Sequence, residues 1–243
     1  MHRRAARGLP HRLRTERGTL MRIRRTLGAA ALAAVALTSA AITPAQAAGS
    51  AVLTHTAVGG PDIAVGDVLT ADLVPGSYAT FYSSATGTSG IKCATSSFSA
   101  TVTGNPAAPG VATEQLNTQT FGSCTINVVG VTSVQSITVN NLPYTNSVSD
   151  AAGNPVTLAP TAAGPLQTTV VLKTILGTIT CVYRAPGSIS GTTSNTGQTI
   201  GFASQAFTKV AGPSLCFAAG YFSATYGPVV DSSVAGSPHV YIN

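Results

Sequence analysis

Short runs of β-branched and aromatic residues alternate with turn residues along the chain, and helical periodicity is almost absent. At residues 135–139 and 168–175 apolar and polar positions alternate, which is typical of strands with one buried and one wet face. The pattern predicts strands at residues 51–58, 68–73, 78–83, 91–103, 111–119, 124–129, 135–142, 156–158, 167–175, 178–183, 188–191, 199–207, 220–226 and 240–242.

Turn signals such as Gly59-Gly60-Pro61 and Gly104-Asn105-Pro106 separate these runs. Many short strands at this spacing predict an all-β fold, an antiparallel β-sandwich or barrel-like domain. No long linker interrupts residues 48–243, so we expect one β-domain there. We expect it to consist of two duplicated halves, residues 48–160 and 161–243, joined near residues 159–165.

Residues 21–47 have the three parts of an export signal. Arg22, Arg24 and Arg25 form a basic start, an uncharged apolar stretch follows, and a small-residue site ends it. The spacing of Ala45 and Ala47 predicts cleavage between Ala47 and Ala48. No later apolar run is long enough to span a bilayer as a helix. The sequence therefore predicts a secreted protein, extracellular or associated with the cell envelope, with no transmembrane anchor after cleavage.

Two features before the apolar stretch leave alternatives open. Residues 1–20 are interpreted as an extension from a start codon assigned too early, with Met21 as the true first residue, or as a basic arm. The pair Arg24-Arg25 belongs to a twin-arginine (Tat) signal, which exports folded proteins, or is the ordinary basic start of a general secretory signal.

An even number of cysteines in an exported chain predicts disulfides rather than a metal site, since no Cys-x-x-Cys pair occurs. The four are Cys93, Cys124, Cys181 and Cys216. Spacing alone allows three pairings. Two segments look alike, because a Gln-x-Phe follows the first cysteine by 26 residues at Gln119 and by 24 at Gln205. This internal repeat favours Cys93–Cys124 and Cys181–Cys216.

The positive formal charge of the whole chain, +6, comes from an excess of arginines in the N-terminal segment. Residues 48–243 hold four basic and six acidic side chains, which gives −2. We therefore expect no nucleic acid partner.

Groups suited to catalysis are scarce in the mature chain. It has two histidines, His55 and His239, and no Gly-x-Ser-x-Gly motif. Residues 149–154 are interpreted as a hairpin turn, because they lack the acidic density of a calcium loop. We expect no enzyme, no catalytic residues, no cofactor and no metal. Catalysis would need the two histidines to meet near a carboxylate.

Two aromatic groups are ambiguous between core and ligand platform. If residues 220–226 form a strand, Phe222 and Tyr226 share one face and Tyr221 takes the other. Tyr78, Phe81 and Tyr82 form the second group. The absence of Trp weakens a carbohydrate platform, and the core interpretation is favoured.

Three segments carry a family resemblance: residues 81–87, 179–184 and 215–226. They resemble small secreted proteins of Streptomyces and related actinobacteria that are labelled only by a Tat signal sequence. The resemblance brings no activity and no site residue, but it favours the Tat route.

The sequence therefore predicts a secreted, non-enzymatic, disulfide-stabilised β-protein that acts by surface contact with cell wall, extracellular protein or glycan. One alternative is an extracellular ligand- or glycan-binding module with a cleft lined by aromatic residues. Another is a secreted enzyme inhibitor presenting residues 103–111 or 192–198.

Overall fold

The structure is a computed structural model that describes residues 50–243, and these residues form strands and turns without a helix. Residues 1–20 and the predicted signal peptide, with Arg24, Arg25, Ala45, Ala47 and Ala48, lie outside the described residues. The strands are β1 (Leu53–His55), β2 (Val68–Asp72), β3 (Ala79–Tyr82), β4 (Gly90–Gly104), β5 (Val111–Ile126), β6 (Val131–Asn140), β7 (Tyr144–Ser149), β8 (Pro155–Ala159), β9 (Gln167–Thr174), β10 (Gly177–Arg184), β11 (Ile189–Ser194), β12 (Thr199–Ala211), β13 (Ala219–Tyr226), β14 (Val230–Asp231) and β15 (Val240–Ile242).

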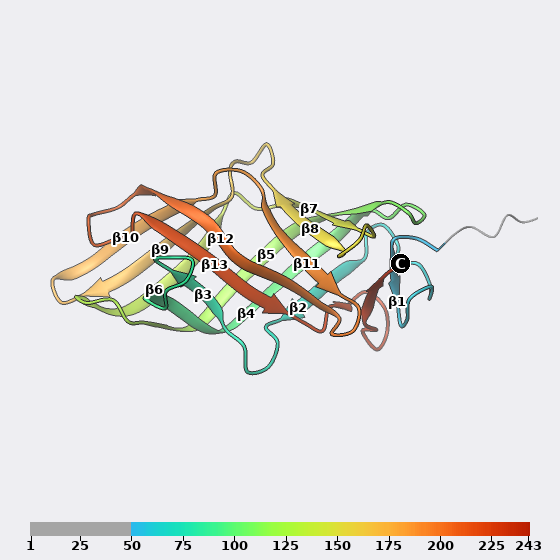
Figure 1. The fold of residues 1–243 in the computed structure, drawn as a ribbon, viewed down its shortest axis with the longest axis horizontal. Helices are drawn as coiled ribbons and strands as arrows, with labels where there is room; N and C mark the ends of the chain where they lie inside the picture. The colour runs from blue at the N-terminus through green and yellow to red at the C-terminus, as the bar shows by residue number, and fades with distance from the viewer. Residues whose placement is uncertain (1–49) are drawn as a thin grey trace, which may run out of the picture. The chain divides into compact units, whose positions relative to one another are not determined.

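Eight of these strands close into an antiparallel barrel (Figure 1). Their order is β11-β8-β7-β5-β4-β3-β13-β12, and β11 pairs with β12 to complete the ring. Of the two architectures expected from the strand pattern, the chain therefore adopts the barrel. Closure pairs the edge strands that an open sheet would leave unsatisfied.

Strand β12 belongs to two parts of the sheet. Its first residues pair with β11, and its last residues, from Thr208 to Ala211, pair with β10. The ladder continues from β10 to β9 and ends at β6. Strands β10, β9 and β6 therefore extend the barrel wall on one side.

A second, two-stranded sheet of β1 and β15 lies at the opposite end from the turns of β6, β9 and β10 (Figure 1). Leu53 and Ile242 from this sheet line a small cavity together with Phe98 and Val148 of the barrel. The sheet therefore covers this end of the barrel interior.

Two strand predictions differ from the structure. Residues 111–119 and 124–129 were expected to be separate strands, but β5 runs without interruption from Val111 to Ile126. Gly122, which resembles a turn signal, lies opposite Thr95 in the β4 ladder, and a Cβ at Gly122 would meet Thr95 Oγ1 at 2.6 Å. Pairing with β4 therefore continues through a segment whose composition favours a turn.

The pattern also missed β7 and the short β14. Strand β7 has the sequence Tyr-Thr-Asn-Ser-Val-Ser, in which Asn and Ser favour turns. Its residues nevertheless alternate strictly between buried and half-buried, with Asn146 among the buried ones. Residues 150–154 form the turn between β7 and β8, where a hairpin turn was expected.

The two disulfides join Cys93 to Cys124 and Cys181 to Cys216, the pairing expected from the likeness of the two segments. The segments do not form separate bodies, since β3 pairs with β13, β8 with β11, and β6 with β9. The duplication of the halves stays a prediction.

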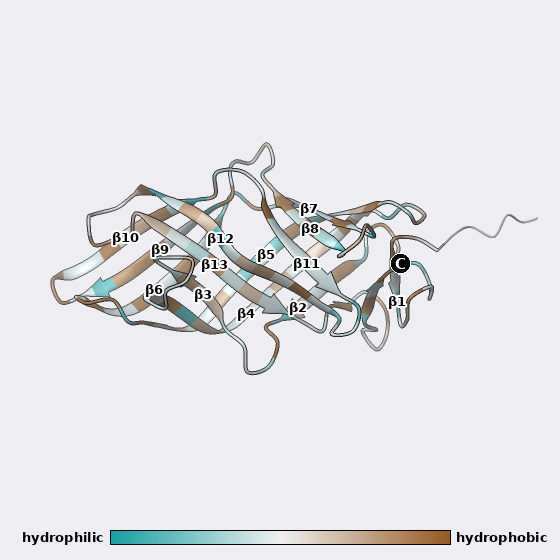
Figure 2. Ribbon diagram, viewed as in Figure 1, coloured by the Kyte–Doolittle hydropathy of each residue, from teal (hydrophilic) through white to brown (hydrophobic). Residues whose placement is uncertain are grey.

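Alternation along the strands places apolar side chains inside the barrel. Figure 2 shows hydrophobic and hydrophilic residues mingled along the same strands. On β3, β10 and β12 the inward residues include Phe81, Tyr183 and Phe207. Phe81 packs edge-to-face on the other two rings, at centroid distances of 4.9 Å and 5.8 Å.

The ring of Phe81 lies directly on Gly220 of β13. A Cβ at Gly220 would come within 2.0 Å of Phe81 Cζ, so this position has no room for a side chain. We expect Gly220→Ala to destabilise the protein by about 1–3 kcal/mol, because the ring must leave its packed position. Urea unfolding measures this loss. Gly201→Ala is the matched control, since a Cβ at Gly201 on β12 would have ordinary space, with Thr225 Oγ1 at 3.8 Å. Equal effects of the two variants would contradict the prediction.

Candidate functional site

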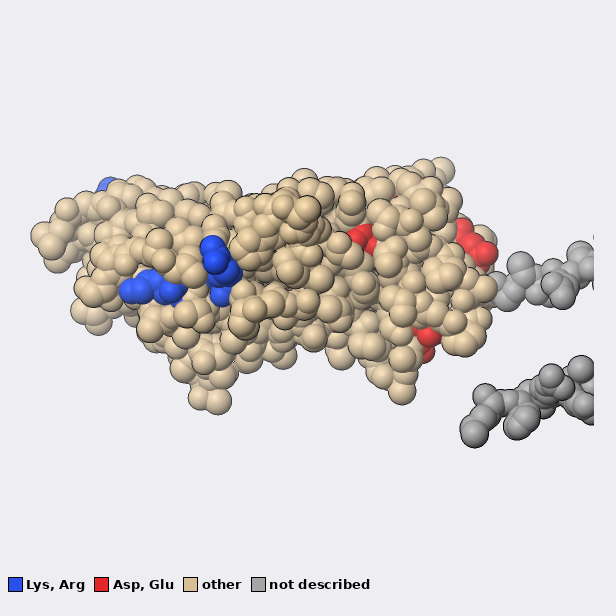
Figure 3. All heavy atoms as spheres, turned by 90° about the horizontal axis from the view of Figure 1, so that it is seen from above, with Lys and Arg blue, Asp and Glu red and all other residues tan. Residues whose placement is uncertain are grey.

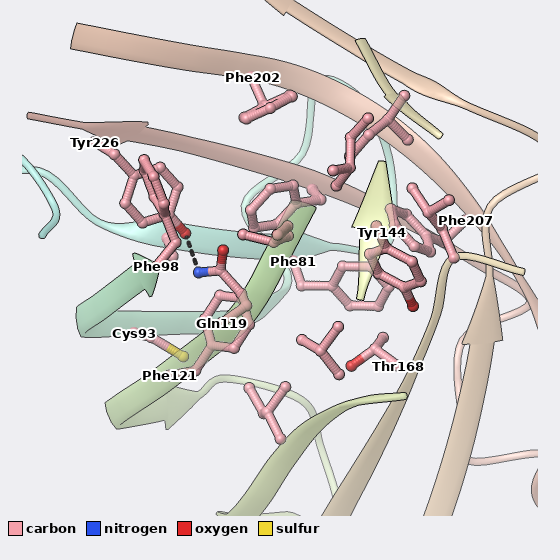
Figure 4. A pocket seen from close by; sticks show the side chains of 18 of the residues that line it. Phe81, Cys93, Phe98, Gln119, Phe121, Tyr144, Thr168, Phe202, Phe207 and Tyr226 are labelled. Atoms are coloured by element: carbon pink, nitrogen blue, oxygen red, sulfur yellow. Dashed lines mark hydrogen bonds between the residues drawn. The ribbon is translucent and has the colours of Figure 1, made fainter. Parts of the chain in front are cut away.

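A hollow with a volume of about 120 Å³ lies inside the barrel. Aromatic rings from several strands surround it (Figure 4): Phe81, Phe98, Phe121, Tyr144, Phe207 and Tyr226. Aliphatic side chains such as Ile137, Val139 and Val170 complete the wall. None of its lining residues is charged. We call this hollow the barrel cavity.

One polar cluster reaches the barrel cavity. Ser96 Oγ donates to Thr120 O at 2.6 Å, and Tyr226 Oη lies 2.9 Å from Ser96 Oγ. Gln119 Nε2 donates to both hydroxyl oxygens, each at 2.9 Å. Because the Ser96 hydroxyl proton is committed to Thr120, Tyr226 donates to Ser96, and both hydroxyls are left as acceptors for Gln119.

This chain of donors orients the Gln119 amide. Figure 4 shows its nitrogen directed at the Tyr226 hydroxyl and its oxygen turned away. No hydrogen bond to Gln119 Oε1 occurs among residues 50–243. Burial raises the pKa of Tyr226 to about 12, while the bonds to Ser96 and Gln119 lower it, so the phenol stays protonated. Gln119 Oε1 is therefore a free hydrogen-bond acceptor in the uncharged wall of the cavity.

A pair of buried polar side chains, Asn146 and Glu114, lies inside the barrel near the end that the β1–β15 sheet covers. Asn146 Nδ2 donates to Glu114 Oε2 at 2.7 Å. Asn146 lines the barrel cavity, and Glu114 lines the small cavity beneath the β1–β15 sheet, so the pair lies between the two. Asn146 Oδ1 is buried without a hydrogen-bond partner.

Glu114 is 3% exposed, which makes it a buried carboxyl group without a cationic partner among the described residues. Burial raises its pKa from 4.5 to about 7, and the hydrogen bond from Asn146 opposes this shift. Burial therefore favours the neutral, protonated form of Glu114.

A seam in the barrel wall borders the cavity. Residues 117–126 of β5 pair with β4 along one edge, and β6 pairs with β9 along one edge, but no ladder joins β5 to β6. Half-buried residues of both strands line the cavity along this seam: Gln119, Phe121, Ile137 and Val139. The seam ends at the 127–130 turn and at the Leu116–Tyr144 pair.

The aromatic groups expected from the sequence divide between the two faces of the wall. Phe222 and Tyr226 both line the cavity and Tyr221 does not, as the strand alternation predicted. Likewise Phe81 lines the cavity, and Tyr82, which lies opposite Tyr221, does not. Gln119 and Asn146 also line the cavity but were not predicted from the sequence. Alternation along β5 does not identify Gln119, because a register shift after Leu116 moves the inward positions from even to odd residue numbers.

The histidines lie at the end of the molecule with the β1–β15 sheet. His55 pairs with Val240, and Thr56 N donates to the carbonyl of His239 at 2.9 Å, so the two histidines are neighbours. The buried carboxylate of Asp231 is close enough to interact with His55. No hydrogen bond joins either imidazole to a carboxylate in the described part of the chain. Residues 50–243 also hold no group of three or more His, Cys, Asp or Glu side chains suited to a metal ion.

Among the described residues, no helix has the length and apolar character to cross a membrane. Comparison with known proteins found no match to a protein-family model, to a curated protein or to a solved structure.

Proposed function

We propose that this protein is a non-enzymatic extracellular binding protein that holds a small, neutral and largely apolar molecule in the barrel cavity. The observation that carries the proposal is the cavity itself, an uncharged hollow lined by aromatic and aliphatic side chains. Preformed apolar hollows with a few convergent polar groups are typical of small-molecule sites. Two disulfides support an oxidising environment outside the cell.

The volume limits the ligand. An engineered cavity of about 150 Å³ lined by apolar residues holds benzene. The barrel cavity, at about 120 Å³, suits a ligand of one small ring or a short branched chain. Its uncharged wall disfavours ions, because a buried charge needs a partner. Gln119 Oε1 favours a ligand that has one hydroxyl or amine donor.

The seam between β5 and β6 supplies a route to the cavity. Opening it would break no β-ladder hydrogen bond, because neither strand is paired across it. Half-buried side chains line both sides of the seam, so the seam can open by movement of these side chains while the β-ladders stay intact.

Titration calorimetry with toluene and phenol tests the proposal on protein purified from culture medium. We expect both compounds to bind. We expect Val139→Phe, which fills the cavity from β6, to abolish both interactions. Gln119→Met should weaken phenol about 3- to 10-fold and leave toluene unchanged, because it removes one hydrogen-bond acceptor.

Val58→Phe is the matched control, since Val58 is exposed and does not line the cavity. This variant should bind like the natural protein. If neither toluene nor phenol binds, or if Val139→Phe binds both unchanged, the proposed function is wrong.

A further inference from the structure

Apolar side chains occupy the most exposed turns at one end of the barrel. Ile175 and Leu176 form the two-residue turn between β9 and β10, and they are 77% and 94% exposed. Val129, in the turn between β5 and β6, is 92% exposed. Two-residue hairpin turns favour Asn, Asp and Gly, and exposed turns favour polar residues generally. Turn geometry therefore does not explain these residues.

The turns lie together in space. Val131 pairs with Thr174, which places the 127–130 turn beside Ile175 and Leu176. Leu215 lies in the turn before β13, and its Cδ1 would be 3.9 Å from a Cβ at Gly130. All three turns form the end of the molecule opposite the β1–β15 sheet (Figure 1), coloured hydrophobic in part in Figure 2. We call Val129, Ile175, Leu176 and Leu215 the apolar tip.

The β9–β10 turn is held with its two side chains outward. Thr174 Oγ1 donates to Gly177 O at 2.9 Å and accepts a hydrogen bond from Leu176 N at 3.1 Å. These bonds satisfy the backbone of the turn without burying Ile175 or Leu176.

The charges of the barrel are separated along its length. Three of the four basic side chains among residues 50–243 lie on strand ends near the tip. Lys92 lies opposite Thr125, one residue before the end of β5, and Lys173 and Lys209 flank the other two turns. Arg184 lies opposite Gln167, at the other end of β10. Lys173 is three residues from Leu176, and Lys209 Nζ donates to Pro213 O, in the turn that contains Leu215, at 3.1 Å. Figure 3 shows the basic residues on one half of the visible face and the acidic residues on the other.

We propose that the apolar tip docks on the surface of a bilayer containing anionic lipid. An apolar tip flanked by lysines fits the two chemical zones of such a surface. The aliphatic side chains enter the acyl boundary, and the lysine side chains meet the anionic headgroups. The acidic residues at the other end orient the barrel with its tip toward the membrane. Docking does not depend on the barrel cavity being occupied.

Vesicle co-sedimentation tests this proposal, with protein purified from culture medium and the absence of the export signal verified by mass. The probes are phosphatidylcholine vesicles with and without phosphatidylglycerol. We expect binding only when phosphatidylglycerol is present, and a loss of at least about fivefold when salt is raised from about 0.05 M to about 0.5 M, as expected of interactions that salt screens.

The double variant Ile175→Asn/Leu176→Gly places the preferred hairpin-turn residues at the tip, so it retains the fold while removing two of the four apolar side chains of the tip. We expect it to bind the anionic vesicles at least about tenfold more weakly. Val65→Asn, at an exposed valine outside the tip, should bind within about twofold of the natural protein.

Absence of vesicle binding by the natural protein, or equal binding by the double variant, would overturn the proposal. A soluble anionic polymer, heparin, identifies the other kind of partner. If heparin captures the natural protein and the double variant equally, and vesicle binding is also unchanged in the variant, the basic residues act alone and the bilayer is not the partner.

Discussion

Raising the pH from 5 to 8 is expected to lower the free energy of unfolding through Glu114 by about 3 kcal/mol. The ordinary pKa of 4.5 applies in the unfolded chain, and burial raises the folded pKa to about 7. Between these values the folded protein binds the proton more tightly than the unfolded chain. The stabilisation from this proton is complete below the unfolded pKa and is lost as the pH rises to the folded pKa and beyond.

Urea unfolding of the natural protein and Glu114→Gln at both pH values measures this effect. A glutamine at position 114 is neutral at both pH values, so the stability of the variant should lack this component of the pH dependence. At pH 8 we expect the variant to be more stable by about 3 kcal/mol. Asp72→Asn, at an exposed carboxyl on β2, controls for the general loss of one acid. A pH dependence that Glu114→Gln and Asp72→Asn alter equally would show that burial of Glu114 has no such effect.

Removing either disulfide is expected to lower the free energy of unfolding by about 3–4 kcal/mol, because the cross-link restricts the unfolded chain. The sequence separations are 31 and 35 residues, so the two bonds have similar expected effects. The variants are Cys93→Ala/Cys124→Ala and Cys181→Ala/Cys216→Ala. Urea unfolding at constant pH compares each with the oxidised natural protein.

The reduced natural protein provides the control for both variants. Once reduced, it should be less stable than either double variant in its oxidised form, because it lacks both cross-links. A loss below about 1 kcal/mol in a double variant would mean that the unfolded chain is already restricted there without the bond.

The cavity and the tip bear on the two leading functional hypotheses in different ways. The cavity supports a ligand-binding module, although Tyr82 and Tyr221 are not part of its wall. The tip supports contact with the cell envelope. A protein that docks on a membrane and holds a small apolar molecule would combine both, and the calorimetric and vesicle experiments test the two parts separately.

Part of the site follows from local pattern. Alternation along residues 220–226 assigns Phe222 and Tyr226 to one face, and the structure places both at the cavity. The burial of Glu114 cannot be predicted from the local sequence pattern. It depends on the β1–β15 sheet covering the barrel end and on Asn146, which lies on a strand whose composition favours turns.

By itself, the sequence determined that the chain is built of strands, because a period of two is a local property. Its internal repeat favoured, among three possible pairings, the cysteine pairing that the structure has. Only the tertiary structure decided that the sheet closes, that no ladder joins β5 to β6, and that the exposed turns with apolar residues meet at one end. Those features depend on which strands pair and in what register. Hydrogen bonds between residues far apart in the chain set both, and alternation within one strand carries no information about its partner.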